Sequence, residues 1–408
     1  MRCRFCHSPL SNEFVDLINS PLSNSFLEKG QLNEPEVFYP LRLFVCENCF
    51  LVQIDEYKKS GEIFNEDYAY FSSFSSTWLD HARDYVESMC ERLGLDSKSF
   101  VIEVGSNDGY LLQYFQKRRI PCLGIEPTKG TAQAAREKGI DVLEDFFGTR
   151  LANSIESQGK KADLLIGNNV LAHVPDLNDF VAGMKIVLKP EGVITVEFPH
   201  LMRTMEGNQF DQIYQEHYCY YSLHTLLQVF DFHGMTIFDV DEITTHGGSL
   251  RIYIRHKEDQ SKPVSANVTR IHQTELEKGY NKLDVYKAFA EQVRETKRQF
   301  LEFLIQAKRE GKQVVGYGAP GKGNTLLNYC GVRTDFIDYT VDRNLYKHYK
   351  YLPGTHIPVF PTEQIGITKP DYIVIMPWNL KDEISAQLEY TREWGAKLVV
   401  PIPELTVF

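Results

Sequence analysis

The chain has 408 residues, enough for two or three domains, and its charged (24%) and hydrophobic (43%) fractions are those of a soluble globular protein. A formal net charge of −11 argues against broad nucleic-acid binding, which normally rests on a basic face, but leaves room for a local basic pocket. No apolar run reaches the length of a membrane span, and two cysteines stand where a signal peptide would need its apolar core. We therefore expect a cytoplasmic protein with neither a nucleic-acid nor a membrane partner, whose cysteines are thiols or metal ligands.

Two CxxC pairs stand near the start of the chain, Cys3 with Cys6 and Cys46 with Cys49. Each pair can direct two thiolates at one metal ion, and four thiolates complete a tetrahedral zinc site that has no open position. The pattern therefore predicts a structural Zn²⁺ site. Two alternatives stay open: redox chemistry, which usually uses one such pair at the start of a helix, and His7 as a substitute for one cysteine.

The stretch before residue 98 is rich in aromatic and hydroxyl side chains and takes on helical spacing from about Thr77. Tyr68 and Tyr70 could reach a substrate over the edge of a sheet. The alternative is that these rings pack between the metal module and the next domain.

Residues 101–126 have the order strand, glycine-rich turn, helix, strand and acid, which is the first half of a nucleotide-binding α/β unit. The turn reads ExGxxxG instead of the GxGxxG of a dinucleotide site. Its acidic side chains would repel a pyrophosphate and suit a cationic ligand, such as the amino acid moiety and sulfonium of S-adenosylmethionine, while the final acid is placed to take two ribose hydroxyls. An ordinary βαβ unit with a structural glycine turn is the alternative. The predicted cofactor residues of this unit are Glu103, Gly105, Asn107, Gly109, Tyr110 and Glu126.

Polar residues also follow the third and fourth strands of this domain. Asp145 could accept a hydrogen bond from an adenine amino group while the ring of Phe146 covers the base. Asn168 and Asn169 begin a loop that, in a doubly wound sheet, lies against the nucleotide and faces the second substrate. We add these four residues to the predicted cofactor site.

The segment 210–222 holds four tyrosines, an acid and an imidazole within eight residues, a composition with no obvious packing purpose. We predict that His217 is functional here, although an isolated histidine is more often structural. Glu216 and His217 are sequence neighbours, so their side chains should diverge and act on different groups. Tyr220 and Tyr221 are predicted substrate residues.

The second half of the chain contains a double glycine at 247–248 before a strand, a long helix expected over 283–310 to join two domains, and a second α/β domain. Its first turn contains Lys322 and no carboxylate, which suits a phosphate or pyrophosphate, and the P-loop spacing is absent. Trp378 could stack on a base or lie in the core. The predicted substrate residues of this half are Ser249, Arg251, Lys322, Asn324, Thr325, Asp342, Arg343 and Trp378.

Over essentially the whole chain, these motifs resemble those of the nucleotide-sugar C-methyltransferases of deoxysugar biosynthesis. The matching segments are the paired CxxC and residues 103–109, 168–176, 214–217, 247–251 and 322–329. The resemblance implies an α/β protein with an N-terminal zinc-binding module, a central class I S-adenosylmethionine-dependent methyltransferase domain and a C-terminal Rossmann-like domain. The expected ranges are 1–65 for the module, 66–282 for the methyltransferase domain, 283–310 for the linking helix and 311–408 for the last domain.

The resemblance also implies roles for single residues. The histidine that matches His217 is the general base, Tyr214, Glu216 and His173 line the active site, and Tyr68 matches a further active-site tyrosine. One departure lies in the C-terminal turn, where Pro320-Gly321 replaces small alanine-like residues. That departure affects the details of the phosphate cradle and not the domain.

The implied reaction is S-adenosylmethionine-dependent methylation of a carbon, C-3 by family expectation, in a nucleotide-linked 4-keto deoxysugar. A base would remove the proton beside the ketone, and the enolate would take the methyl group with inversion. Two alternatives are O- or N-methylation of a small molecule by the same scaffold, and a zinc-ribbon binding module without activity. A hydroxyl acceptor would not need a ketone, so dependence on the ketone separates the first two. The sequence does not reveal the oligomeric state and is compatible with a monomer.

Overall fold

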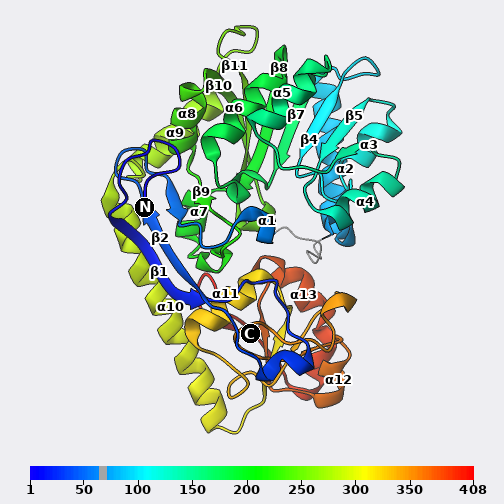
Figure 1. Cartoon of the computed structure of the whole chain (residues 1–408). Helices are drawn as coiled ribbons and strands as arrows, with labels where there is room; N and C mark the ends of the chain where they lie inside the picture. Colours follow the sequence, from blue (N-terminus) through cyan, green and yellow to red (C-terminus); the bar gives the residue numbers. More distant parts are fainter. Residues whose placement is uncertain (64–70) are drawn as a thin grey trace.

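The structure is a computed structural model that describes residues 1–63 and 71–408. It contains an N-terminal sheet, a central sheet and a C-terminal sheet, with the long helix α10 (Leu283–Arg309) along the N-terminal and C-terminal sheets (Figure 1). Within the described ranges, every helix is too short or too polar to cross a bilayer. The predicted domain limits stay predictions.

The N-terminal sheet has the antiparallel order β1-β2-β3-β9. Its last strand comes from far along the chain, so the metal module and the segment around residue 217 share one sheet. β1 lies along α10 (Figure 1). The bounds are β1 Asn12–Ser20, β2 Tyr39–Val45, β3 Val52–Ile54 and β9 Cys219–Tyr220.

The central sheet has the order β10-β11-β8-β7-β4-β5-β6, in which β11 runs antiparallel to the other six strands. The chain goes from β4 outward to β6 and then returns to β7 on the other side of β4. This reversal makes the carboxyl ends of β4 and β7 the place where such a sheet binds ligands. The bounds are β4 Val101–Val104, β5 Cys122–Ile125, β6 Val142–Leu143, β7 Ala162–Asn168, β8 Leu188–Pro199, β10 Met235–Ile243 and β11 Ser249–His256.

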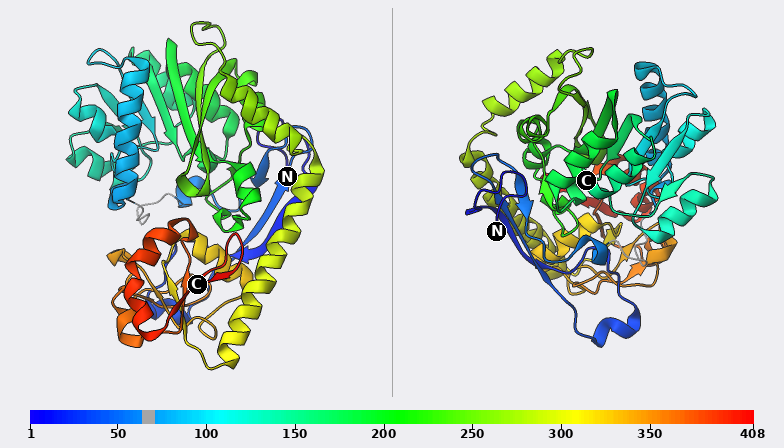
Figure 2. Two further views of the ribbon diagram at one scale, coloured as in Figure 1. Left: turned by 180° about the vertical axis from the view of Figure 1, so that it is seen from behind. Right: turned by 45° about the horizontal axis from the view of Figure 1, so that its top comes forward.

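Helices cover both faces of the central sheet, because apolar strand residues alternate between the two sides. Leu164 and Ile166 of β7 pack with α2 and α3, and Leu165 packs with α5 and α6. Figure 1 shows α5 and α6 in front of the sheet, and Figure 2 (left) shows α2 on the opposite face. The bounds are α1 Ser60–Ile63, α2 Ser76–Leu93, α3 Leu112–Lys117, α4 Lys129–Glu137, α5 Thr149–Ser157, α6 Leu177–Val187, α7 Leu201–Glu206, α8 Leu223–Phe232 and α9 Ala266–Glu277.

The C-terminal sheet has the Rossmann-like order β14-β13-β12-β15-β16-β17, parallel except for β17. The predicted linking helix is α10, and Phe289, Val293 and Phe300 form part of its buried side. The switch in strand order lies between β12 and β15. The bounds are α10 Leu283–Arg309, β12 Val314–Tyr317, α11 Gly321–Cys330, β13 Thr340–Val341, β14 Val359–Phe360, α12 Gln364–Thr368, β15 Tyr372–Ile375, α13 Lys381–Gln387, β16 Lys397–Val400 and β17 Thr406–Val407.

Candidate active site

The four cysteines of the CxxC pairs come together in the N-terminal module, although 39 residues separate the pairs. Their sulfur atoms all lie within 4.8 Å of one another, with Cys3 3.5 Å from Cys49 and Cys6 3.5 Å from Cys46. Zn–S bonds of about 2.3 Å in a tetrahedron place sulfur atoms about 3.8 Å apart, so the cluster has the size of a zinc site. Hydrogen bonding with Cys3 and Cys46, together with burial, raises the pKa of the Cys49 thiol. The residues fit structural zinc.

The glycine-rich turn after β4 is shaped for close approach. Gly105 and Gly109 have φ of 69° and 73°. A Cβ atom at Gly109 would lie 2.4 Å from the Ile140 side chain, so only glycine fits between the turn and the segment before β6. Asn107 also has positive φ, and its side chain accepts the backbone N–H of Ser72 at 2.9 Å.

Glu126 is held at the end of β5 by the same turn. Its carboxylate oxygens accept backbone N–H groups from Asn107 (3.0 Å) and Thr128 (2.9 Å). These two bonds orient the carboxylate and leave each oxygen a further lone pair for a ligand hydroxyl. Burial raises the pKa of Glu126.

An excess of buried negative charge surrounds the turn. Glu103 is buried beside Tyr110, and burial together with the charges of Glu126 and Asp108 raises the pKa of Glu103 well above its usual value. Lys138 pairs with Asp108 at 3.1 Å, which balances one charge of the three. A cationic ligand would relieve this excess, as the sequence suggested.

Three buried polar atoms at the carboxyl ends of β4 and β7 have no hydrogen-bond partner within residues 1–63 and 71–408. They are Oε2 of Glu103, Oδ1 of Asn168 and Nδ2 of Asn169. Buried polar groups are normally paired, so unpaired atoms at the switch point indicate that a polar ligand completes the site. The donors and acceptors match the amino acid moiety of S-adenosylmethionine.

At the end of β6, Asp145 is one-third exposed and pairs with Arg150 at 2.6 Å, and the ring of Phe146 is exposed. An exposed ring beside a partly engaged carboxylate is compatible with the predicted adenine site. Neither side chain lies in the apolar core.

His217 lies in a cluster of rings beside the loop that follows β7. The centroid of its half-buried ring is 4.0 Å from that of Tyr214, 4.7 Å from that of His173 and 6.0 Å from that of Tyr220. The structure therefore brings together four of the predicted residues from two segments that lie 40 residues apart in the chain. Tyr68 and Tyr70 are outside the described residues.

A backbone contact fixes the tautomer of His217. Its Nδ1 lies 3.0 Å from the carbonyl oxygen of Gln212, which can only accept, so Nδ1 carries the proton and Nε2 keeps its lone pair. Burial and the neighbouring His173 lower the pKa of His217, and burial lowers the pKa of His173 to about 4. The His217 ring is thus a neutral base at ordinary pH.

Glu216 points away from its neighbour, as predicted. Its carboxylate is buried and accepts a hydrogen bond from Nδ2 of Asn24 at 3.0 Å. Asn24 belongs to the loop after β1, so the N-terminal module contributes directly to this region. Sequence reasoning did not identify Asn24.

Both predicted substrate tyrosines after His217 line, together with His217, a cavity of about 10 Å³, the size of one water molecule. Tyr221 is buried, and its hydroxyl donates to the carbonyl oxygen of Leu171 at 3.1 Å. The Tyr221 side chain is therefore engaged within the core.

Arg251, another predicted substrate residue, is held by an acid that the sequence did not single out. Its guanidinium pairs with the fully buried Glu197 of β8, whose other oxygen lies 2.9 Å from Nε2 of His81. Burial would raise the pKa of Glu197, but His81 and Arg251 lower it. The Ser249 hydroxyl donates to the carbonyl oxygen of Thr245 at 2.9 Å. Both predicted side chains are therefore occupied by neighbours from the chain itself.

The C-terminal turn meets the segment that carries His217. Lys322, at the start of α11, lies 4.7 Å above the ring of Trp378, and burial lowers the pKa of its ammonium group. Trp378 donates its indole N–H to Asp211 at 2.8 Å. Asn324 and Thr325 are the other two predicted substrate residues of α11. Asn324 is buried, and Thr325 donates its hydroxyl to the carbonyl oxygen of Ile213 at 2.8 Å.

Asp342 and Arg343 follow β13, and the first of them contacts the turn that precedes α11. Asp342 accepts the backbone N–H of Ala319 at 2.7 Å, and Lys347 lies 3.3 Å from the same carboxylate oxygen. Arg343 is exposed and lies 3.5 Å from Glu383. Asp342 therefore shapes the turn that precedes α11, and Arg343 lies on the surface.

Family models match along most of the chain. A zinc binding domain matches residues 3–64, a methyltransferase domain matches residues 78–240, and a C-methyltransferase C-terminal domain matches residues 244–403. C-methyltransferase NovU of Streptomyces niveus is 31% identical over 402 residues, which cover 98% of this chain and 95% of the relative. The chain belongs to this C-methyltransferase family.

Two further similarities of this C-methyltransferase cover less than half of the chain. A ubiquinone biosynthesis O-methyltransferase of Pasteurella multocida is 31% identical over 125 residues, 28% of this chain and 50% of that protein. The crystal structure of an S-adenosylmethionine-dependent methyltransferase from Clostridium acetobutylicum covers 44% of this chain and 92% of that chain, at 12% identity and a TM-score of 0.36.

These findings confirm the predicted fold class and cofactors. The C-methyltransferase has a class I S-adenosylmethionine-dependent methyltransferase domain, and S-adenosylmethionine is its cofactor. The zinc binding domain includes all four clustered cysteines. The individual site residues stay predictions.

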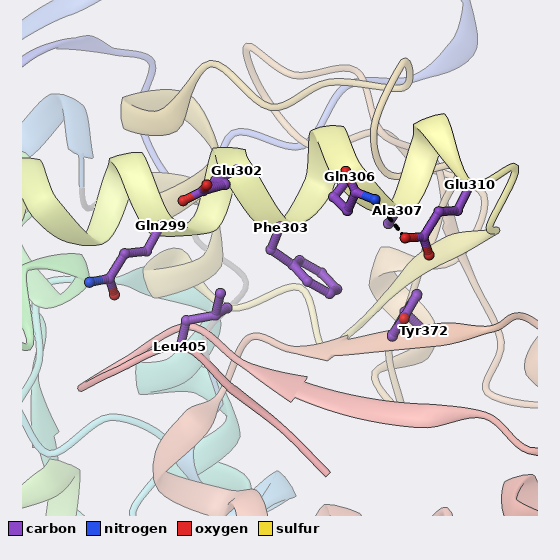
Figure 3. Close-up of a pocket in the computed structure, with 8 residues that line it drawn as sticks. All are labelled: Gln299, Glu302, Phe303, Gln306, Ala307, Glu310, Tyr372 and Leu405. Carbon is purple, nitrogen blue, oxygen red and sulfur yellow. Dashed lines mark hydrogen bonds between the residues drawn. The ribbon is translucent and has the colours of Figure 1, made fainter.

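A separate cavity of about 420 Å³ lies between α10 and the C-terminal sheet of the C-methyltransferase (Figure 3). Phe303 and Tyr372 meet edge to face at its floor. None of the residues that line it is a predicted site residue; they are Gln299, Glu302, Phe303, Gln306, Ala307, Glu310, Tyr372 and Leu405.

Proposed function

We propose that the protein methylates a carbon atom next to the ketone of a nucleotide-linked 4-keto deoxysugar, with His217 as the general base. The observation that carries the proposal is the fixed tautomer of His217, whose Nε2 lone pair lies among tyrosine and histidine rings. A C–H bond beside a ketone is acidic enough to lose its proton to such a base. The substrate class rests on the sequence resemblance and on the phosphate-compatible turn of the C-terminal domain.

The chain's own residues divide the work. His217 takes the proton at Nε2 while Gln212 holds Nδ1. The phenol of Tyr214, whose ring centroid is 4.0 Å from that of His217, would donate a hydrogen bond to the developing enolate oxygen, a contribution of about 3 kcal/mol for one well-placed donor. Glu216, held by Asn24, orients the sugar or Tyr214. When bound, S-adenosylmethionine supplies the electrophilic methyl group.

Lys322 and the start of α11 would bind the diphosphate. The backbone N–H groups of the turn and one ammonium group suit an anion, and α11 has ten residues. The same helix contacts the segment before His217 through Thr325. A nucleotide held here would therefore present its sugar toward the base.

The test is exchange of the substrate proton in the His217→Asn variant. Wild-type enzyme in deuterated water should exchange the hydrogen beside the ketone, and the variant should lose exchange and methylation while it keeps its affinity for S-adenosylmethionine. Normal exchange in the variant would remove His217 as the base. Methylation of an acceptor without a ketone would favour O- or N-methylation instead.

A further inference from the structure

The segment that carries His217 is attached to the C-terminal domain at three successive points. The ring of Phe210 meets that of Tyr329 edge to face at 5.5 Å. Next along the chain, Asp211 accepts the indole N–H of Trp378, and the carbonyl oxygen of Ile213 accepts the hydroxyl of Thr325. Because Gln212 lies between the last two contacts, they determine where its carbonyl oxygen points, and that oxygen holds the base.

Asp211 is a costly residue to place at such a point. Its side chain is fully buried, Oδ2 accepts from Trp378 at 2.8 Å, and Oδ1 has no hydrogen-bond partner in the described part of the chain. Burial raises its pKa to about 6, and the charge of Lys322 opposes that rise. Removing a carboxylate from water costs several kcal/mol, and an apolar residue would pack here at lower cost. The cost indicates a role beyond packing.

Trp378 connects this carboxylate to the predicted diphosphate-binding cation. Its N–H binds Asp211 of the methyltransferase half, and its ring lies under the ammonium group of Lys322. A Cβ atom at Gly247 would lie 2.5 Å from the same ring, so a glycine from the methyltransferase half makes room for it. One indole therefore touches both halves of the site.

We propose that the Asp211–Trp378 hydrogen bond positions His217, so that the domain that binds the nucleotide also sets the geometry of the base. Neither residue touches the reacting atoms, and both are positioning residues. The inference rests on the proposed role of His217 and adds that the C-terminal domain contributes to catalysis through the Gln212 carbonyl, besides binding substrate.

The test compares two tryptophans of the same domain. Trp378→Phe keeps a ring under Lys322 and removes the N–H that Asp211 accepts. Trp394→Phe is the matched control, because the Trp394 indole N–H donates at 3.0 Å to the carbonyl oxygen of Pro370, within the C-terminal domain. For both variants the measurements are kcat, KM for the keto sugar, affinity for S-adenosylmethionine, cofactor-free solvent exchange and thermal unfolding.

We expect Trp378→Phe to lower kcat and the exchange rate by about ten- to a hundredfold, the range for a lost hydrogen bond to a charged group. KM and cofactor affinity should change by less than about threefold, since the binding groups remain. Trp394→Phe should keep the wild-type kcat and exchange rate. Asp211→Leu, which has a similar shape and no acceptor, should resemble Trp378→Phe, and the double variant should be no slower than either, because both changes break one contact.

Three outcomes would overturn the inference: wild-type exchange in Trp378→Phe, an effect on KM alone, or additive losses in the double variant. If Asp211→Leu does not fold, Trp378→Phe decides alone. The wild-type enzyme separates the two proposals. If it shows no exchange, the proposed base fails and the positioning role with it; if it exchanges and Trp378→Phe exchanges equally, only the positioning role fails.

Discussion

The turn after β4 and the segment before β9 both lie at the carboxyl end of the central sheet, but they are held in different ways. The turn is fixed by residues close to it in the chain, chiefly by the backbone N–H of Asn107 on Glu126 and by Lys138 on Asp108. The segment that carries His217 is fixed by residues from the two ends of the chain. Asn24 holds Glu216 from the N-terminal module, and Trp378 holds Asp211 from the C-terminal domain.

This difference separates two functions that a small methyltransferase often builds from one domain. The cofactor site depends on a local unit and should tolerate changes elsewhere in the chain. The base depends on all three sheets, so changes far from residue 217 should affect proton removal before they affect cofactor binding. Variants can therefore be chosen that damage one function and spare the other.

The largest effect is expected from loss of zinc. Cys46→Ser, or removal of the metal by a chelator, should unfold the N-terminal module, since structural zinc contributes roughly 10 kcal/mol or more in small zinc domains. β9 pairs with β3 of that module, so solvent exchange at the substrate should be lost as well. Metal content, thermal unfolding and exchange check this prediction.

Cys90→Ala is the matched control for zinc loss, because Cys90 is a free thiol of α2 that lies outside the cluster. It should keep its zinc and its exchange activity. A zinc-free Cys46→Ser protein with wild-type exchange would show that the segment that carries His217 does not depend on the N-terminal module.

A smaller effect should distinguish the two binding partners. Glu126→Gln keeps the shape of the side chain and removes its charge, and it should weaken S-adenosylmethionine by about ten- to a hundredfold while the nucleotide sugar binds normally. Lys322→Ala should do the reverse. Calorimetric titration of each ligand measures both. The opposite order would contradict the assignment of the two turns.

The smallest effect concerns pH and the buried imidazoles. The pKa of His173 is lowered to about 4 in the folded protein, whereas an unfolded histidine titrates near 6.5. Between these values the unfolded chain binds a proton that the native state does not, so stability falls as the pH decreases from about 6.5 to 4. His173→Asn should remove roughly 1–3 kcal/mol of that dependence, as measured by denaturant unfolding at pH 7 and pH 5. An unchanged difference between the two pH values would contradict the neutral, desolvated ring.

The turn after β4 and the segment that carries His217 also differ in how much of each could be predicted from the sequence. The glycine turn with its acids and each CxxC pair are short patterns whose geometry is set by neighbours in the chain. The structure brings the four cysteines together as expected, and the roles of the turn residues stay predictions. For the site that would bind the methyl acceptor, the sequence predicted which types of residue take part but not their contacts. Arg251 and Tyr221 suggested substrate contacts, but Glu197 and the Leu171 carbonyl engage them, and those partners lie 54 and 50 residues away.

Trp378 shows the limit most clearly. The sequence allowed two roles for this residue, stacking on a base or packing in the core. In the structure, its indole N–H binds Asp211 and its ring lies under Lys322. Contacts over 167 residues carry no periodic signal in a single chain. Asn24 was missed for the same reason.

The strand Cys219–Tyr220 has a practical consequence for engineering. It closes a sheet that begins at Asn12, so the first 54 residues and the residues around 217 form one structural unit. A chimera that takes only its N-terminal part from a related enzyme would meet a foreign edge strand and a foreign partner for Glu216. Exchanging acceptor preference between relatives should therefore require both pieces to be transplanted together, even though more than 150 residues of methyltransferase sequence lie between them.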